Sequence, residues 1–245
     1  MSKPLFHQCV WPAVMLLLSG CATLNGPPDP HDPWERFNRT MYSFNDKLDR
    51  TVLKPVAKGY RSVTPDSAEK GISNFFSNID DVIVIANDIF QLKPVQALSD
   101  TGRFLINSTL GIGGLFDVAT PIGLKKHDED FGQTLGRWGV DQGPYLVLPF
   151  FGSSSIRDGF GLATDLYMHP LNEVEDSGAR AGLFLLNTVS LRAGLLEAGD
   201  IVDEAAYDPY IFLRELYLQR RRNLVHDGSP PADPLDEEID IFSDE

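Results

Sequence analysis

Residues 131–152 read Phe-Gly-Gln-Thr-Leu-Gly-Arg-Trp-Gly-Val-Asp-Gln-Gly-Pro-Tyr-Leu-Val-Leu-Pro-Phe-Phe-Gly. Five of these residues are glycines, and a glycine in a helix interior is destabilising by about 1 kcal/mol relative to alanine. The run Asp141-Gln142-Gly143-Pro144 has the composition of a turn and lies between two short apolar arms. The segment therefore predicts a hairpin-like loop.

The sequence on both sides of this loop predicts helices. Upstream, apolar residues recur at spacings of three and four, which places them on one helix face: Trp34, Phe37, Met41, Phe44 and Leu48. Similar signals predict helices from Thr64 to Ile79, Asp80 to Gln91, Pro94 to Leu110, Ser155 to Tyr167, Gly178 to Leu196 and Asp208 to Val225. No repeat of solenoid length is visible. The predicted fold class is all-α, with one helical domain over residues 32–225.

Three of these helices begin with recognisable capping residues. Asp32 is expected to cap the first helix, with Glu35 completing a capping box. Ser155 and Asp208 are expected to cap the helices that follow them, because a side-chain oxygen at that position accepts a hydrogen bond from a free backbone N–H.

The N-terminal residues have the pattern of an export signal. Lys3 precedes an apolar run from Val10 to Leu18, which is about half the length required to span a bilayer. The run ends Leu18-Ser19-Gly20-Cys21, the pattern of a bacterial lipobox. We therefore expect a signal peptide over residues 1–20, a lipid anchor on Cys21 and a Pro- and Gly-rich tether over residues 21–31. Ala22 after the lipidated cysteine favours export to the outer membrane of a Gram-negative bacterium, with the chain on the periplasmic side.

The charge of the chain is concentrated at its C-terminus. The formal net charge is −14, and residues 226–245 hold eight acidic residues and no Lys or Arg. This composition predicts a disordered acidic tail. The chain lacks the basic surface that neutralises phosphates, so nucleic acid is not an expected partner.

The sequence offers no catalytic or metal-binding pattern. Residues 152–156, Gly-Ser-Ser-Ser-Ile, lack the second glycine of a nucleophile elbow, and no His lies at an evident partner spacing. The histidines have no zinc-ligand spacing. We expect no enzymatic activity, no cofactor and no metal. A lipid hydrolase that uses Ser153, Ser154 or Ser155 is the enzymatic alternative.

Five stretches of the chain resemble the MlaA/VacJ family of outer-membrane lipoproteins. In family order, they are Asn-Arg-Thr-Met-Tyr-Ser-Phe-Asn-Asp at 38–46, Leu-Ile-Asn-Ser-Thr-Leu-Gly-Ile-Gly-Gly-Leu-Phe-Asp at 105–117, Phe-Gly-Gln-Thr-Leu-Gly at 131–136, Gly-Pro-Tyr-Leu-Val-Leu-Pro-Phe-Phe-Gly at 143–152 and Asp-Pro-Tyr-Ile-Phe-Leu-Arg-Glu-Leu-Tyr at 208–217. They are distributed across residues 32–225, nearly the whole body of the chain. The tether and the tail carry no such motif.

The resemblance implies a ring-shaped arrangement of amphipathic helices in the inner leaflet of the outer membrane, with a central amphipathic channel. It implies removal of phospholipid misplaced in the outer leaflet, transfer to a periplasmic carrier, and association with trimeric porins. The gating residues it implies are Phe44 and Asn45. The channel and hairpin residues it implies are Leu135, Trp138, Gly143, Pro144, Tyr145, Val147, Leu148, Phe150 and Phe151. The alternative within the resemblance is a scaffold that binds porins without transporting lipid.

Overall fold

The computed structural model describes residues 29–231. Cys21, the expected signal peptide, most of the expected tether and residues 232–245 of the expected tail lie outside the described residues.

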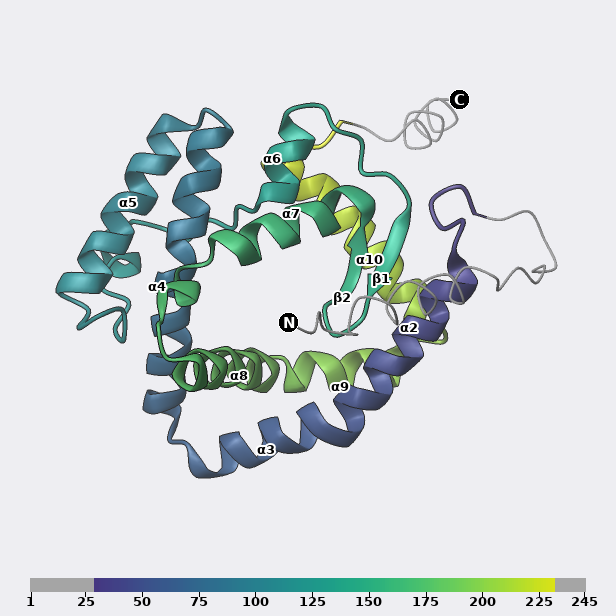
Figure 1. The fold of residues 1–245 in the computed structure, drawn as a ribbon, viewed down its shortest axis with the longest axis horizontal. Helices are drawn as coiled ribbons and strands as arrows, with labels where there is room; N and C mark the ends of the chain where they lie inside the picture. Colours follow the sequence, from purple (N-terminus) through teal and green to yellow (C-terminus); the bar gives the residue numbers. More distant parts are fainter. Residues whose placement is uncertain (1–28, 232–245) are drawn as a thin grey trace, which may run out of the picture.

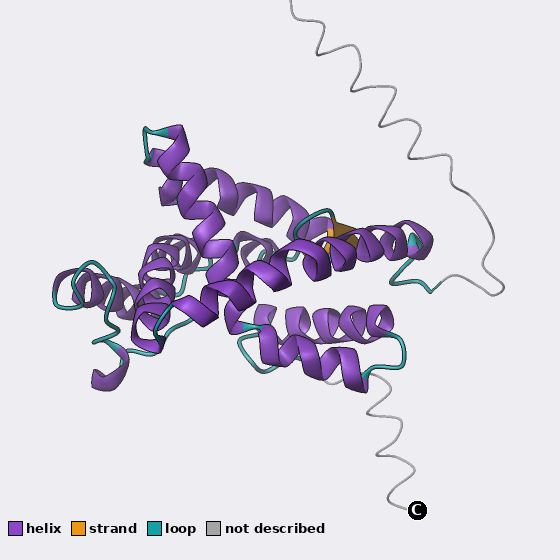
Figure 2. Ribbon diagram, turned by 90° about the horizontal axis from the view of Figure 1, so that it is seen from below, coloured by secondary structure: helices purple, strands orange, loops and turns teal. Residues whose placement is uncertain are grey.

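The described chain is mostly helical, as the sequence predicts (Figure 2). The helices are α2 (Glu35–Leu48), a π-helical segment (Asp49–Leu53), α3 (Lys54–Val63), α4 (Asp66–Phe90), α5 (Pro94–Thr109), α6 (Phe131–Arg137), α7 (Ile156–Met168), α8 (Ser177–Gly194), α9 (Leu196–Ala205) and α10 (Pro209–Val225). Two 3₁₀ turns cover Thr120–Ile122 and Pro170–Glu173. Strands β1 (Tyr145–Leu148) and β2 (Gly152–Ser155) form an antiparallel hairpin.

The helices follow one another around the centre of the view in Figure 1. Four groups of elements surround this centre. They are α4, α7, α8 together with α9, and α2 together with the hairpin. α5 packs on the outside of α4, α6 packs on α7, and α3 packs beneath α8. Within residues 29–231, none of the helices is both long and apolar enough to cross a bilayer.

The helical region from Glu35 to Val63 runs further than the sequence pattern predicts. Pro55 lies in the first turn of α3, where the proline ring would clash with the carbonyl of the residue four positions earlier. The chain avoids the clash by widening to a π-helix over Asp49–Leu53, in which Lys54 N donates to the carbonyl of Asp49. Likewise, α4 is one helix rather than the two predicted over 64–91.

The hairpin exists, but the prediction of its position in the chain was wrong. Residues 131–137 form helix α6, and the chain turns at 149–151 rather than at Asp141–Pro144. The glycines of α6 permit close packing on α7 instead of breaking the helix. A Cβ at Gly132 would lie 2.6 Å from a carboxyl oxygen of Asp158. Asp130 caps α6 by accepting a hydrogen bond from Gln133 N at 2.8 Å.

Two of the three predicted caps are confirmed. Ser155 accepts a hydrogen bond from Asp158 N, and Asp208 accepts hydrogen bonds from the backbone at the start of α10. Asp32 does not cap α2, which begins at Glu35 without a side-chain cap. The Asp32 side chain is instead buried among residues distant in sequence.

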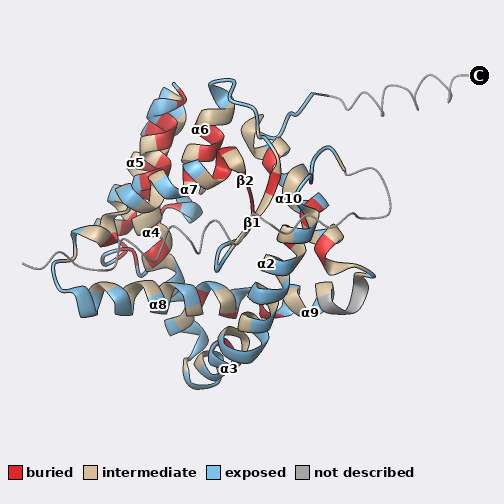
Figure 3. Cartoon of the chain, turned by 45° about the vertical axis from the view of Figure 1, so that its right-hand side comes forward, coloured by how far each residue is buried: buried red, intermediate tan, exposed pale blue. Residues whose placement is uncertain are grey.

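Buried residues are distributed unevenly (Figure 3). They run through α4, α5, α6 and α7, whereas α3 and α8 are mostly exposed or half-buried. One apolar cluster consists of Ala57, Ala193 and Leu196, where α3 meets α8 and α9. The other consists of Tyr145, Val147 and Tyr210, where β1 meets α10.

Candidate functional site

The turn of the hairpin is the most unusual piece of backbone near the predicted site residues. Leu148 pairs with Gly152, and Pro149, Phe150 and Phe151 connect the two strands. Phe150 has a φ of 69°, in the left-handed region that L-residues with a side chain avoid. Its side chain is nevertheless 70% exposed. A conformation of this kind persists only where neighbouring contacts hold it.

Those contacts come from Phe44 and Asn45 on α2. Asn45 Nδ2 donates to the carbonyl of Leu148 at 2.9 Å, and Phe150 N donates to Asn45 Oδ1 at 2.8 Å. The rings of Phe44 and Phe150 meet edge to face, with centroids 5.5 Å apart. The structure thus brings the two predicted gating residues into direct contact with the hairpin turn.

An apolar groove of about 320 Å³ lies between the hairpin and α7. Its lining consists of Leu148, Pro149 and Phe151 from the hairpin, and Gly159, Leu162, Ala163 and Leu166 from α7. No side chain in this lining can carry a charge or donate a hydrogen bond. The groove therefore suits hydrocarbon and offers nothing to hold a metal ion or a polar cofactor.

The other predicted site residues are divided among three places. Tyr145 and Val147 belong to the hairpin, but they are only 1% and 2% exposed and pack as core against Tyr210. Leu135 lies in α6, and Trp138 directly follows this helix. The indole N–H of Trp138 donates to the carbonyl of Phe90 at 3.0 Å. The expectation that these two residues belong to the hairpin was wrong, because residues 131–137 are helical.

Gly143 and Pro144 lie in the connection between α6 and β1. Gly143 has a φ of 66°, so the backbone there favours glycine. The carbonyl of Pro144 accepts a hydrogen bond from Ile156 N at 3.2 Å, which ties this connection to the start of α7.

A network of charged residues behind the groove fixes α6, α7 and α10 to one another. Arg221 of α10 donates to Asp130 and to Asp158, each at 2.9 Å. Burial tends to raise the pKa values of both aspartates, but Arg221 outweighs it and holds both below their ordinary value. Burial and Asp158 together raise the pKa of Tyr217, which donates to that carboxylate. This network makes α7 a fixed wall of the groove.

The serines of the alternative hydrolase hypothesis make structural hydrogen bonds. Ser153 Oγ lies 2.9 Å from the hydroxyl of Tyr145, Ser154 Oγ donates to the carbonyl of Ser155, and Ser155 caps α7. Among residues 29–231, no group of three or more His, Cys, Asp or Glu side chains is placed to hold a metal ion.

A second surface exposes apolar side chains over α5 and the loop that follows it. Leu98 is 75% exposed, and the others are Val95, Leu105, Leu110, Ile112, Phe116 and Ile122. Exposed apolar side chains gathered on one helix and the loop after it are typical of a contact with a membrane or with another protein.

Sequence reasoning missed Asn38 and Asp32, as well as the α7 side of the groove. Asn38 is fully buried and contacts the hairpin backbone, with its amide nitrogen 3.0 Å from the carbonyl of Tyr145. The signal that could have found it is its position seven residues before Asn45, which places both amides on one face of a helix.

Comparison with known proteins identifies relatives that span most of this chain. A family profile described as MlaA lipoprotein matches residues 30–224. The intermembrane phospholipid transport system lipoprotein MlaA of Escherichia coli K12 is 37% identical over 217 residues, which cover 86% of this chain and 86% of that protein. The protein of the same name from Haemophilus influenzae is 34% identical over 220 residues, which cover 87% of this chain and 88% of that protein.

A solved structure has a similar fold. It comes from work on the structural basis for maintenance of bacterial outer membrane lipid asymmetry. Its TM-score to this chain is 0.69 at 37% sequence identity, and the match covers 79% of this chain and 98% of that one.

Proposed function

The chain belongs to the MlaA lipoprotein family, and we propose that it transports phospholipid between membranes and so maintains the lipid asymmetry of the outer membrane. We propose that it removes phospholipid misplaced in the outer leaflet and passes it to a periplasmic carrier. The single observation that supports a lipid substrate is the uncharged groove between the hairpin turn and α7.

The physical requirement for this activity is an apolar path. Drawing both acyl chains of a phospholipid into water costs on the order of 20–25 kcal/mol, at about 0.8 kcal/mol per CH₂ group. A wall of Leu148, Phe151 and Leu162 removes much of that cost for the portion of a chain that it covers. We propose that the groove forms part of an amphipathic channel through the ring of helices, and that the contact of Phe44 and Asn45 with the hairpin turn controls access to it. Every proposed step is binding or movement, with no bond broken.

Location and partners follow from the same proposal. The exposed apolar side chains over α5 would lie among acyl chains of the inner leaflet, and lipid on Cys21 would anchor the chain on the periplasmic side. A trimeric porin and a periplasmic phospholipid carrier are the proposed protein partners. The porin would give access to the outer leaflet, and the carrier would receive the lipid.

Native mass spectrometry of the protein extracted in mild detergent tests the lipid-binding claim, because it detects bound lipid and bound porin in one spectrum. The wild-type chain should carry phospholipid. Ala163→Glu, which places a charge in the groove, should lower the bound fraction several-fold. Tyr167→Glu is the control, since Tyr167 lies on α7 but does not line the groove. Bound porin with no lipid in any sample would favour the scaffold alternative.

A further inference from the structure

We propose that Asn38 is a second positioning residue of the hairpin, that it acts together with Asn45, and that Asp32 dictates its orientation. The importance of this role for transport rests on the proposed function. The hydrogen bonds of Asn38 and Asn45 to the hairpin, here called the clamp, are a feature of the fold and can be tested separately from transport.

The two asparagines make the same pair of contacts with successive parts of the hairpin. Asn38 Nδ2 donates to the carbonyl of Tyr145 at 3.0 Å, and Val147 N donates to Asn38 Oδ1 at 2.8 Å. Asn45 repeats this pattern on the carbonyl of Leu148 and the N–H of Phe150. The Asn38 amide therefore pairs with the free edge of β1 as the backbone of a neighbouring strand would, and the Asn45 amide repeats the pairing where the chain leaves β1 for the turn.

The spacing of the two asparagines matches the spacing of the groups that they bind. Seven residues of an α-helix rise about 10.5 Å and return to nearly the same face. The carbonyls of Tyr145 and Leu148 are three residues apart, and three residues of strand extend about 10 Å. One face of α2 thus carries both amides, the first opposite β1 and the second opposite the turn. Two contacts at this spacing fix where the hairpin lies along α2 and how far it lies from α2.

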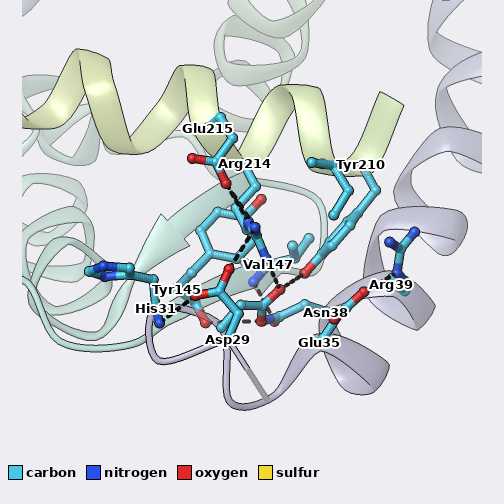
Figure 4. Close-up of polar contacts among 12 residues, drawn as sticks. Asp29, His31, Glu35, Asn38, Arg39, Tyr145, Val147, Tyr210, Arg214 and Glu215 are labelled. Carbon is cyan, nitrogen blue, oxygen red and sulfur yellow. Dashed lines mark hydrogen bonds and ion pairs between the residues drawn. The ribbon is translucent and has the colours of Figure 1, made fainter. Parts of the chain in front are cut away.

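The orientation of the Asn38 amide is set by Asp32. Asn38 Nδ2 donates a second hydrogen bond to Asp32 Oδ1 at 2.8 Å, and Asp32 is 1% exposed. Asp32 Oδ2 accepts from the hydroxyl of Tyr210 and from Arg214 Nη1, the latter at 3.2 Å. Because an ionised carboxylate can only accept hydrogen bonds, the amide nitrogen must face it, and this leaves Oδ1 to receive Val147 N. Figure 4 shows Asn38 on α2 beside Tyr145 and Val147 of β1 and Tyr210 of α10.

The segment before α2 completes the same support. The carbonyl of His31 accepts from Tyr145 N at 2.9 Å, and Asp29 pairs with Arg214 at 2.8 Å. Residues 29–32 thus link the start of the described chain to both the hairpin and α10 (Figure 4).

The two ends of the clamp differ in their environment. Asn38 is fully buried within this polar network, whereas the hydrogen bond from Phe150 N to Asn45 lies at an exposed position. We therefore assign Asn38 to the fixed base of the hairpin and Asn45 to the end that can release. In the full-length protein in detergent, the N–H of Phe150 should exchange with solvent faster than the N–H of Val147.

Hydrogen exchange read at single amides tests the clamp. Asn38→Leu keeps the branched shape of the side chain and removes its hydrogen bonds to Asp32, Tyr145 and Val147, so the exchange rate at Val147 should rise about tenfold while Phe150 changes less. Asn45→Leu should give the reverse pattern. Asn87→Leu is the matched control, because Asn87 is equally buried but its amide contacts Asp165 and Thr134 rather than the hairpin backbone. Should Asn38→Leu not fold, Asp32→Asn decides the question, since losing the fixed acceptor should also speed exchange at Val147.

Unchanged exchange at Val147 in Asn38→Leu, or an equal rise in Asn87→Leu, would overturn the proposal. The lipid readout is surface-exposed phospholipid in cells that make each variant at wild-type level. Asn38→Leu should alter it and Asn87→Leu should not. If exchange at Val147 rises as expected while surface phospholipid stays at the wild-type level, the clamp stands and the role of the hairpin in transport is contradicted.

Discussion

The α4–α5 region and the hairpin are both held by buried polar side chains, but of different kinds. In the α4–α5 region the partners are charged. Arg103 is buried between Asp81 and Asp117, and Lys93 pairs with the buried Glu129. At the hairpin the groups that contact the backbone are the neutral amides of Asn38 and Asn45.

This difference separates a fixed part of the molecule from a part that can be displaced. Removing one partner of a buried ion pair leaves an uncompensated charge and costs about 3–5 kcal/mol. Losing a neutral hydrogen bond costs about 0.5–1.5 kcal/mol. The α4–α5 region can therefore hold a large apolar surface rigidly, whereas the hairpin turn can leave Asn45 at a cost that lipid binding can offset.

The largest expected effect is on the buried ion pairs. Arg103→Met should lower the free energy of unfolding by about 3 kcal/mol, because Asp117 loses Arg103 and Asp81 keeps only Lys126 as an ion-pair partner. Arg61→Met is the control, since Arg61 pairs with the exposed Glu197 and should contribute about 0–1 kcal/mol. Denaturant unfolding of both variants in one detergent measures the difference. Equal losses would remove the contrast between the two regions.

The close approach of α6 and α7 should give the next largest effect. A Cβ at Gly161 would lie 2.3 Å from the backbone N of Gly132, so Gly161→Ala should force the helices apart and cost about 1–3 kcal/mol. A Cβ at Gly182 on α8 meets nothing within 4 Å, so Gly182→Ala should stabilise the chain by about 0.5–1 kcal/mol. Thermal melts should move in opposite directions. A stable Gly161→Ala protein would show that α7 is not a fixed wall.

The carboxyl of Asp88 should make the stability of the α4–α5 region depend on pH. Burial and the neighbouring Asp100 raise the pKa of Asp88 from 3.8 to about 7. Because the pKa is higher in the folded state, the protonated carboxyl contributes stability. This contribution is fully present below pH 3.8 and is lost as the pH rises through about 7. The wild-type chain should therefore unfold more easily at pH 8 than at pH 5, and Asp88→Asn should reduce that difference. An identical pH profile for the two proteins would contradict the assignment.

The smallest effect on stability is expected at the hairpin turn, where the effect on function should be largest. Asn45→Ala should lower the free energy of unfolding by only about 1 kcal/mol, because its bonds to Leu148 and Phe150 lie at the molecular edge. It should nevertheless change the amount of surface-exposed phospholipid. Asn74→Ala serves as the control, since the Asn74 amide contacts the carbonyl of Leu115 away from the hairpin. A large loss of stability in Asn45→Ala would place the turn in the fixed part of the molecule.

The sequence predicted the features whose causes are local. Helix spacing, the caps at Ser155 and Asp208 and the all-α class depend on neighbours within a few residues, and the structure confirms them. Residues 131–137 were misassigned because a glycine that permits close helix packing has the same sequence signal as a glycine that breaks a helix. The role of Asp32 was missed for a related reason, since its partners Tyr210 and Arg214 lie 178 and 182 residues away.

The candidate site was predicted in part. The structure brings Phe44, Asn45 and Phe150 together at the turn, and Leu148 and Phe151 line the groove, whereas the gating and channel roles of these residues stay predictions. Tyr145 and Val147 could not be separated from them by sequence, because alternate residues of a strand face opposite sides and the pattern does not say which side is core. The spacing from Asn45 places Asn38 on the same helix face, but its partners on the hairpin are identified only by the pairing of α2 with β1.

The most direct test of lipid transport is the surface phospholipid of a strain from which the gene is deleted. Deletion should raise phospholipid in the outer leaflet. The wild-type chain should return it to the normal level, and Ala163→Glu, made at the same level, should not. A deletion strain whose outer leaflet has the normal phospholipid content would contradict the account.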